Sequence, residues 1–206
     1  MHELRQRGEA VSNRYSMMTS FPLQPTFSHL GLYVIDLPIM EEFYCKTLGF
    51  YVTDRLGNDD QEMIFLSRSL QEHHQIVLAP GRSKTAVSTI NQISFEIGSL
   101  NDLSDAYQGL ISKGIRGMKS MNHGGSWSLY VPDPEKNMIE LFVRTNWYVP
   151  PHATTTLDLN HSEMDIIEQT KLLVNRTPGS MTWDHWRQDF QAKMSHPTDE
   201  ISCSDI

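Results

Sequence analysis

The 206-residue chain has few cysteines, a deficit of basic residues and no long apolar run, and each shortage excludes a class of protein. Its two cysteines, Cys45 and Cys203, are far apart, which favours free thiols in a reducing compartment over a disulfide framework. Lys and Arg number 17 against 25 Asp and Glu, without any basic run, so the composition argues against nucleic-acid binding. No apolar run approaches the roughly 18 residues of a membrane span, and the N-terminus has no apolar signal core. We therefore expect a soluble, cytoplasmic protein without a nucleic-acid or membrane partner.

Two segments of similar pattern follow an N-terminal arm, residues 1–24, that lacks periodicity. Each segment reads as a strand, an amphipathic helix and three further strands, at about 26–84 and about 88–147. Aligning their first strands places His29 opposite Gln92, an offset of 63 residues, which indicates an internal repeat. The expected strands are 27–35, 50–55, 61–67, 74–79, 90–97, 116–119, 126–131 and 137–144.

Capping residues delimit the helices of the two segments. Asp36 is expected to cap the first helix and Gly49 to end it. The second helix is expected to start from Ser99 or Asn101 and to end at Gly114. Both helices carry an apolar face at helical spacing.

The chain changes character after Trp147, and residues 148–206 read as a linker and a helical C-terminal extension. Ser162 and Thr182 are expected to begin its two helices, and the last ten residues look frayed. The second helix carries an apolar stripe of the kind that usually forms core or a subunit contact. Its members are Trp183, Trp186, Phe190 and Met194.

Glu140 stands between Ile139 and Leu141 in the last strand of the second segment. A carboxylate in an apolar strand is costly to bury unless a cation or hydrogen-bond donors meet it. A metal ion would be a suitable partner. His29 in the first strand and Gln92 at the matching place in the later strand are the candidate further ligands.

The paired modules resemble the vicinal oxygen chelate superfamily, which includes glyoxalases, bleomycin-resistance proteins and extradiol dioxygenases. The resemblance covers roughly residues 27–147, within a domain expected at 25–147, and is greatest to type I extradiol ring-cleaving dioxygenases. It rests on one ordered motif, namely His123-Gly124, Ser128-Leu129-Tyr130, Asp133-Pro134, Asn137 and Ile139-Glu140-Leu141. It implies an α+β fold in which paired βαβββ modules form a curved, open, barrel-like sheet, followed here by the helical extension.

The resemblance also implies a metal site and its ligands. In these dioxygenases two first-strand histidines and the last-strand glutamate bind ferrous iron and leave positions open for a catechol and dioxygen. His29 and Glu140 match two of the three ligands, and Gln92 stands where the second histidine is expected. A second departure is Glu135-Lys136, which replaces the usual Asp-Gly of a turn.

Three further residues match substrate-handling positions of the dioxygenases. His74 matches an acid–base histidine, and His123 a histidine that contacts substrate and oxygen. Tyr130, ten residues before Glu140, matches a tyrosine that hydrogen-bonds the substrate hydroxyl. The resemblance therefore implies an Fe(II)-dependent oxidoreductase of aromatic catabolism that acts on an aromatic diol and dioxygen. Because members of this family commonly form oligomers, it also implies a homo-oligomer.

Two other functions stay open at this point. A glyoxalase-, isomerase- or lyase-like enzyme would use Mn, Zn or Ni as a Lewis acid on an enolate. Gln92 favours this reading, whereas Val77 at the position equivalent to Glu140 leaves a four-ligand site incomplete. A non-catalytic binding protein of the bleomycin-resistance type would hold an aromatic ligand between the modules. Trp127, Tyr130 and Phe142 would line such a pocket.

Overall fold

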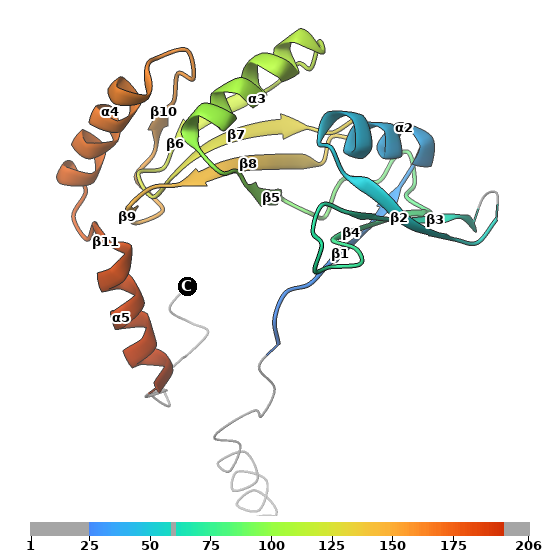
Figure 1. The fold of residues 1–206 in the computed structure, drawn as a ribbon, viewed down its shortest axis with the longest axis horizontal. Helices are drawn as coiled ribbons and strands as arrows, with labels where there is room; N and C mark the ends of the chain where they lie inside the picture. Colours follow the sequence, from blue (N-terminus) through green and yellow to red (C-terminus); the bar gives the residue numbers. More distant parts are fainter. Residues whose placement is uncertain (1–24, 59–60, 196–206) are drawn as a thin grey trace, which may run out of the picture.

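The computed structural model describes residues 25–58 and 61–195, and its elements form two main sheets (Figure 1). The expected arm at 1–24, the expected frayed end and Cys203 lie outside these residues. Cys45 is a half-buried free thiol. In the described part of the chain, no helix has both the length and the apolar character to cross a membrane.

The first sheet has the strand order β1-β4-β3-β2, and the second has the order β10-β6-β7-β8-β5. In each sheet the first strand of a module lies parallel to its last strand, and the other neighbours are antiparallel. The strands of the first sheet are β1 (Leu30–Val34), β2 (Tyr51–Leu56), β3 (Met63–Ser67) and β4 (Ile76–Pro80). Those of the second are β5 (Ile93–Glu96), β6 (Lys119–Asn122), β7 (Ser126–Pro132), β8 (Met138–Arg144) and β10 (Thr155–Thr156).

The strand register confirms the internal repeat. Leu30 of β1 pairs with Ile76 of β4, and Ile93 of β5 pairs with Ile139 of β8. Both members of the first pair therefore precede their counterparts by 63 residues, the offset expected from the sequence. Val77 is consequently the structural counterpart of Glu140, as the sequence comparison indicated.

Each sheet packs one face against a helix. The helices α2 (Leu37–Glu42) and α3 (Leu100–Ser112) both lie above the sheets in Figure 1. Alternate strand residues such as Leu32, Val34 and Ile139 face the core, which is the period of two that strands impose. Because side chains alternate, the intervening residues, including Glu140, belong to the opposite face.

The helix caps follow the sequence expectations, and the first helix differs in its internal geometry. Asp36 accepts a hydrogen bond from the Ile39 amide, and Ser99, rather than Asn101, accepts one from the Asp102 amide. The first helix is not uniform, because a π-helical segment η1 (Phe43–Thr47) continues directly from α2. Gly49 then takes a φ of 72° and ends the segment, as expected.

One predicted strand was misplaced. The expected strand at 116–119 is observed as β6, Lys119–Asn122. The reason is Gly117, which has a φ of 77° and therefore forms a turn in the middle of the expected strand. The shift places the turn carrying His123 directly after β6.

The C-terminal extension contributes to the same core as the two modules. Leu157, Leu159 and Ile166 belong to the core cluster, and the last of them lies on α4 (Glu163–Arg176), which Ser162 caps. The helix α5 (Trp183–Ser195) follows the short pair β9 (Trp147–Tyr148) and β11 (Met181–Thr182).

The aromatic stripe of α5 packs at the periphery rather than in the core. Trp186 stacks between Tyr148 and Phe190, with ring centroids 5.8 and 5.0 Å apart, and Trp183 meets Trp186 edge-on. Phe190 and Met194 stay largely exposed. The core interpretation of the stripe was therefore wrong for its outer half, and the subunit contact stays a prediction.

The turn between β7 and β8 explains part of the sequence motif in structural terms. Asp133 is buried and accepts hydrogen bonds from the amides of Glu135 and Asn137 and from the Asn137 side chain. Desolvation raises the pKa of this carboxyl, and the hydrogen bonds oppose that shift. The Asp133-Pro134 and Asn137 positions thus build a turn and do not face the candidate site.

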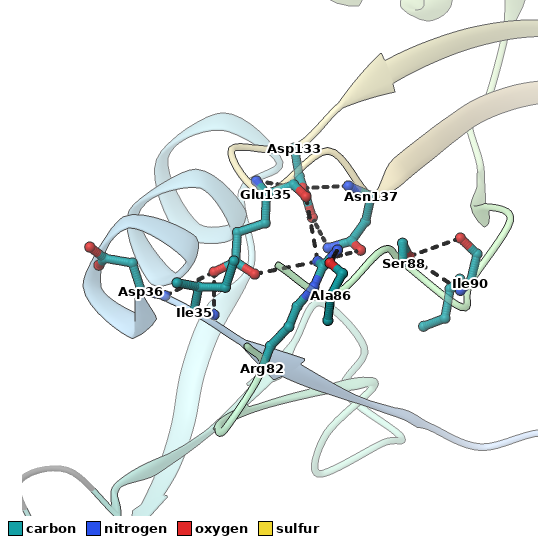
Figure 2. A network of polar contacts seen from close by, with 9 residues as sticks. All are labelled: Ile35, Asp36, Arg82, Ala86, Ser88, Ile90, Asp133, Glu135 and Asn137. Atoms are coloured by element: carbon teal, nitrogen blue, oxygen red, sulfur yellow. Dashed lines mark hydrogen bonds and ion pairs between the residues drawn. The ribbon is translucent and has the colours of Figure 1, made fainter. Parts of the chain in front are cut away.

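The same turn locks the second module onto the first (Figure 2). Glu135 accepts hydrogen bonds from the Ile35 and Asp36 amides at 2.6 and 2.9 Å, just after β1. Arg82, which follows β4, lies 3.5 Å from the Glu135 carboxylate and donates to Asn137 at 3.0 Å. The end of β1, the segment after β4 and the start of β8 are therefore held together by one buried polar network.

Replacing Lys136 by glycine is expected to stabilise the protein. Lys136 has a φ of 66° and is the only non-glycine residue with positive φ in the described chain. A side chain at this φ lowers the folding stability by roughly 1–2 kcal/mol. Glycine avoids this cost, but its greater freedom in the unfolded chain offsets about 0.5–1 kcal/mol of the gain. We expect a net gain of about 1 kcal/mol and a rise in Tm of about 2–4 °C in thermal unfolding. Lys136→Ala is the control and should give no such gain; an equal gain would contradict the backbone explanation.

Candidate functional site

The Glu140 carboxylate is the centre of a polar group on the face of the second sheet opposite α3. Glu140 is 8% exposed, and its Oε2 atom accepts hydrogen bonds from Gln92 Nε2 at 2.7 Å and Ser94 Oγ at 2.5 Å. Gln92 also donates to Ser94 at 3.0 Å. Parallel pairing of β5 with β8 puts Ser94 directly beside Glu140 and leaves Gln92 just before β5.

Tyr130 and His123 extend this group across the sheet. Tyr130 lies opposite Glu140 in the β7–β8 register, and its hydroxyl is 3.0 Å from His123 Nε2. Burial raises the pKa of Tyr130 to about 12, and Glu140 adds to the shift. Burial lowers the pKa of His123 although the charge of Glu140 opposes it. Tyr130 is therefore protonated and His123 mostly neutral at pH 7.

His29 and His74 form a second group on the first sheet. Their ring centroids are 4.3 Å apart, and Phe65 and His73 pack around His74. Desolvation first, and then the neighbouring His29 and His73, lower the pKa of His74. His29 lies immediately before β1, and His74 two residues before β4, so neither is inside the strand in which the sequence placed it.

One part of each group lies at an edge strand, namely His29 just before β1 and Gln92 with Ser94 at the start of β5. β1 and β5 are edge strands, and a cavity of about 510 Å³ is lined by residues from the starts of both. Ser28 and Leu30, the neighbours of His29, line this cavity together with Gln92 and Ser94. The six predicted residues thus occur as two contacting sets, His29 with His74 and Gln92 with Glu140, Tyr130 and His123.

Ser94 is the residue of this site that the sequence analysis missed. A serine in a strand carries no signal of its own. The repeat offers a signal only when it is combined with the parallel pairing of first and last strands, because that pairing identifies the residue beside Glu140. Gln92 and Ser94 both donate to Oε2, and the Tyr130 hydroxyl also hydrogen-bonds the Glu140 carboxylate.

The donor set is compatible with a divalent metal ion. Glu140 forms no ion pair in the part of the chain that the structure describes, although it is buried. A buried carboxylate without a cationic side chain is the situation in which a metal is most favourable. Residues 25–58 and 61–195 contain no ready cluster of three His, Cys, Asp or Glu side chains. Gln92 carries an amide and does not count toward such a cluster, and His29 and Glu140 belong to separate contacting sets.

Comparisons with known proteins agree with the fold. The family model described as the glyoxalase/bleomycin resistance protein/dioxygenase superfamily matches residues 26–141. Among solved structures, a glyoxylase/bleomycin resistance protein/dioxygenase domain from Frankia sp. EAN1pec superimposes with a TM-score of 0.51. It is 20% identical and covers 60% of this chain and 94% of its own, so the likeness concerns the fold alone.

Two curated relatives come from Rhodococcus globerulus. Biphenyl-2,3-diol 1,2-dioxygenase 3 is 32% identical over 146 residues, which are 68% of this chain and 72% of the relative. Biphenyl-2,3-diol 1,2-dioxygenase 2 is 29% identical over 139 residues, 65% of this chain and 70% of the relative. The paired modules, the repeat register and a family match over more than half of the residues all agree. The chain therefore belongs to the glyoxalase/bleomycin resistance protein/dioxygenase superfamily.

Proposed function

We propose that the protein is a metal-dependent extradiol-type dioxygenase that cleaves a catechol-like ring with dioxygen. The observation that carries this proposal is the buried Glu140 carboxylate, which shares one sheet face with the hydrogen-bonded pair Tyr130 and His123. The similarity to two biphenyl-2,3-diol dioxygenases supports the same reaction class.

His29, Gln92 and Glu140 are the residues proposed to hold the metal. Imidazole, amide oxygen and carboxylate together make a three-donor set suited to Fe(II), and Mn, Zn and Ni also accept such donors. When bound, the metal supplies chelation of the two adjacent oxygens of a diol and a meeting point for dioxygen. Gln92 presents its amide nitrogen to Glu140 in this structure, so ligation through oxygen requires the side-chain amide to turn over.

The other polar residues are proposed to orient the substrate and to move its protons. The Tyr130 hydroxyl stays protonated well above pH 7 and can donate a hydrogen bond to a substrate oxygen. A neutral His123 is a suitable acceptor for a proton, and its contact with Tyr130 fixes the ring. His74 is proposed as the acid–base partner on the other edge, where its ring contacts that of His29.

A second candidate function has one observation in its favour. Gln92 and Ser94 both donate to the same oxygen of Glu140, which compensates the buried carboxylate without a cation. This arrangement suits a non-catalytic protein that binds an aromatic ligand. Metal content therefore separates the two proposals directly.

The test is oxygen uptake by anaerobically purified protein whose metal content is measured by mass spectrometry. Catechol and biphenyl-2,3-diol are the first substrates. We expect near-stoichiometric iron and oxygen consumption that depends on both diol and iron. Iron without oxygen uptake for any diol would contradict the dioxygenase, and absence of metal after reconstitution would favour the binding protein.

A further inference from the structure

A buried hydroxyl on α4 connects the C-terminal extension to the turn that carries His123. Thr170 is completely buried. Its Oγ1 atom accepts hydrogen bonds from Asn122 Nδ2 at 2.9 Å and Trp127 Nε1 at 2.8 Å, and it donates to Ile166 O at 2.7 Å. A hydroxyl has one donor and two acceptor positions, so all of them are used.

Asn122 passes this constraint to the turn. Its Oδ1 atom accepts a hydrogen bond from the Gly124 amide at 2.9 Å, one residue beyond His123. Because the Asn122 amide donates to Thr170 with one end and accepts from Gly124 with the other, its orientation is fixed at both ends. Asn122 therefore links the Gly124 amide to Thr170 on α4.

The turn is also held from its other side, so its position is closely defined. Thr145 Oγ1 donates to the Gly124 carbonyl at 2.6 Å. Gly124 has a φ of 72°, and a Cβ atom there would come within 2.7 Å of Val149. The backbone after His123 is thus packed against the segment that follows β8, and Asn122 links the residue before His123 to α4.

We propose that Thr170 is a positioning residue for His123, acting through Asn122 and the Gly124 amide. The catalytic part of this inference rests on the dioxygenase function proposed above. The family match ends at residue 141, whereas α4 begins at Glu163, so this support comes from the chain's own C-terminal extension. The role of α4 is then to fix the imidazole beside Tyr130.

Thr170→Val removes the hydroxyl and keeps the shape of the side chain, and two buried donors lose their acceptor. We expect Asn122 to reorient, amide exchange at Gly124 to rise by about 10-fold, and the His123 ring signals in NMR to shift. The kcat of oxygen uptake should fall by about 10- to 100-fold, as small misplacements of a reacting group do, with KM little changed. Thr170→Ser keeps the hydroxyl, so its Gly124 amide exchange, its His123 ring signals and its kcat should match those of the wild-type protein.

Thr177→Val is the matched control, at the C-cap of the same helix. Thr177 is also buried, and its hydroxyl donates only to the Leu173 carbonyl. Its replacement should lower stability without moving the His123 and Gly124 signals. Equal NMR changes in the Thr170→Val and Thr177→Val proteins would overturn the inference, and so would unchanged signals in Thr170→Val.

The NMR readout separates this inference from the proposed function. If Thr170→Val shifts the His123 signals and Thr170→Ser restores them, the positioning role stands even when the wild-type protein consumes no oxygen with any diol. The absence of oxygen consumption by the wild-type protein would instead contradict the proposed dioxygenase function. If the wild-type protein consumes oxygen and the signals of Thr170→Val do not move, the dioxygenase stands and the positioning role fails.

Discussion

Replacing Glu140 by glutamine should abolish iron binding and oxygen uptake while leaving the fold intact. The substitution keeps the shape of the side chain but removes the charge that a divalent ion requires, and it presents an amide to the donors of Gln92 and Ser94. Loss of an outer-shell partner alone costs roughly 10- to 100-fold in metal affinity, so loss of the only charged ligand should exceed that. Metal content by mass spectrometry and oxygen uptake are the measurements.

Glu96→Gln is the control for this experiment. Glu96 lies on the same face of β5, two residues beyond Ser94, and its carboxylate is 51% exposed and 3.0 Å from the Arg144 guanidinium. Its replacement should leave iron content and oxygen uptake unchanged. Thermal unfolding of both variants shows whether the folded state persists. Stoichiometric iron in the Glu140→Gln protein would show that the ligand assignment is wrong.

The fold was predictable because its signals are local and then repeated. Period-two strands, the caps at Asp36 and Ser162 and a constant offset of 63 residues each follow from short stretches of sequence. The sequence analysis misplaced β6 and did not predict the π-helical segment. Both features depend on backbone geometry that residue type does not determine. Gly117 shows this, because a glycine there permits either a strand or the turn that is observed.

The site was predictable only where one residue carries the signal. Glu140 stands out as an acid in an apolar strand, and its partners Gln92 and Tyr130 follow from the repeat and the family motif. Ser94 and Thr170 were not predictable in this way. Ser94 reaches Glu140 across 46 residues of sequence, and Thr170 reaches Asn122 across 48. Such contacts depend on strand pairing and on the docking of α4, which a single sequence does not encode in any local pattern.

Glu135-Lys136 stands where the family motif has Asp-Gly, and Glu135 is buried and hydrogen-bonded although it lies in a turn. Glu135 has a side chain only 6% exposed, and Arg82 beside it is 11% exposed. Three groups depend on the carboxylate, namely the amides of Ile35 and Asp36 and the Arg82 guanidinium (Figure 2). Removing it leaves a buried positive charge with reduced compensation and two amides without acceptors.

Glu135→Ala should therefore lower the free energy of unfolding by about 3–5 kcal/mol, the cost of breaking a buried ion pair from one side. Glu135→Gln keeps an acceptor for the Ile35 and Asp36 amides and loses only the charge, so its loss should be smaller, about 1.5–3 kcal/mol. Urea unfolding measures both, with Glu168→Ala at an exposed pair as the control that should change little. Since this network ties the end of β1 to the start of β8, destabilisation should be accompanied by weaker metal binding. A Glu135→Ala protein as stable as the control would mean that the two modules are held together by their shared apolar core and not by this network.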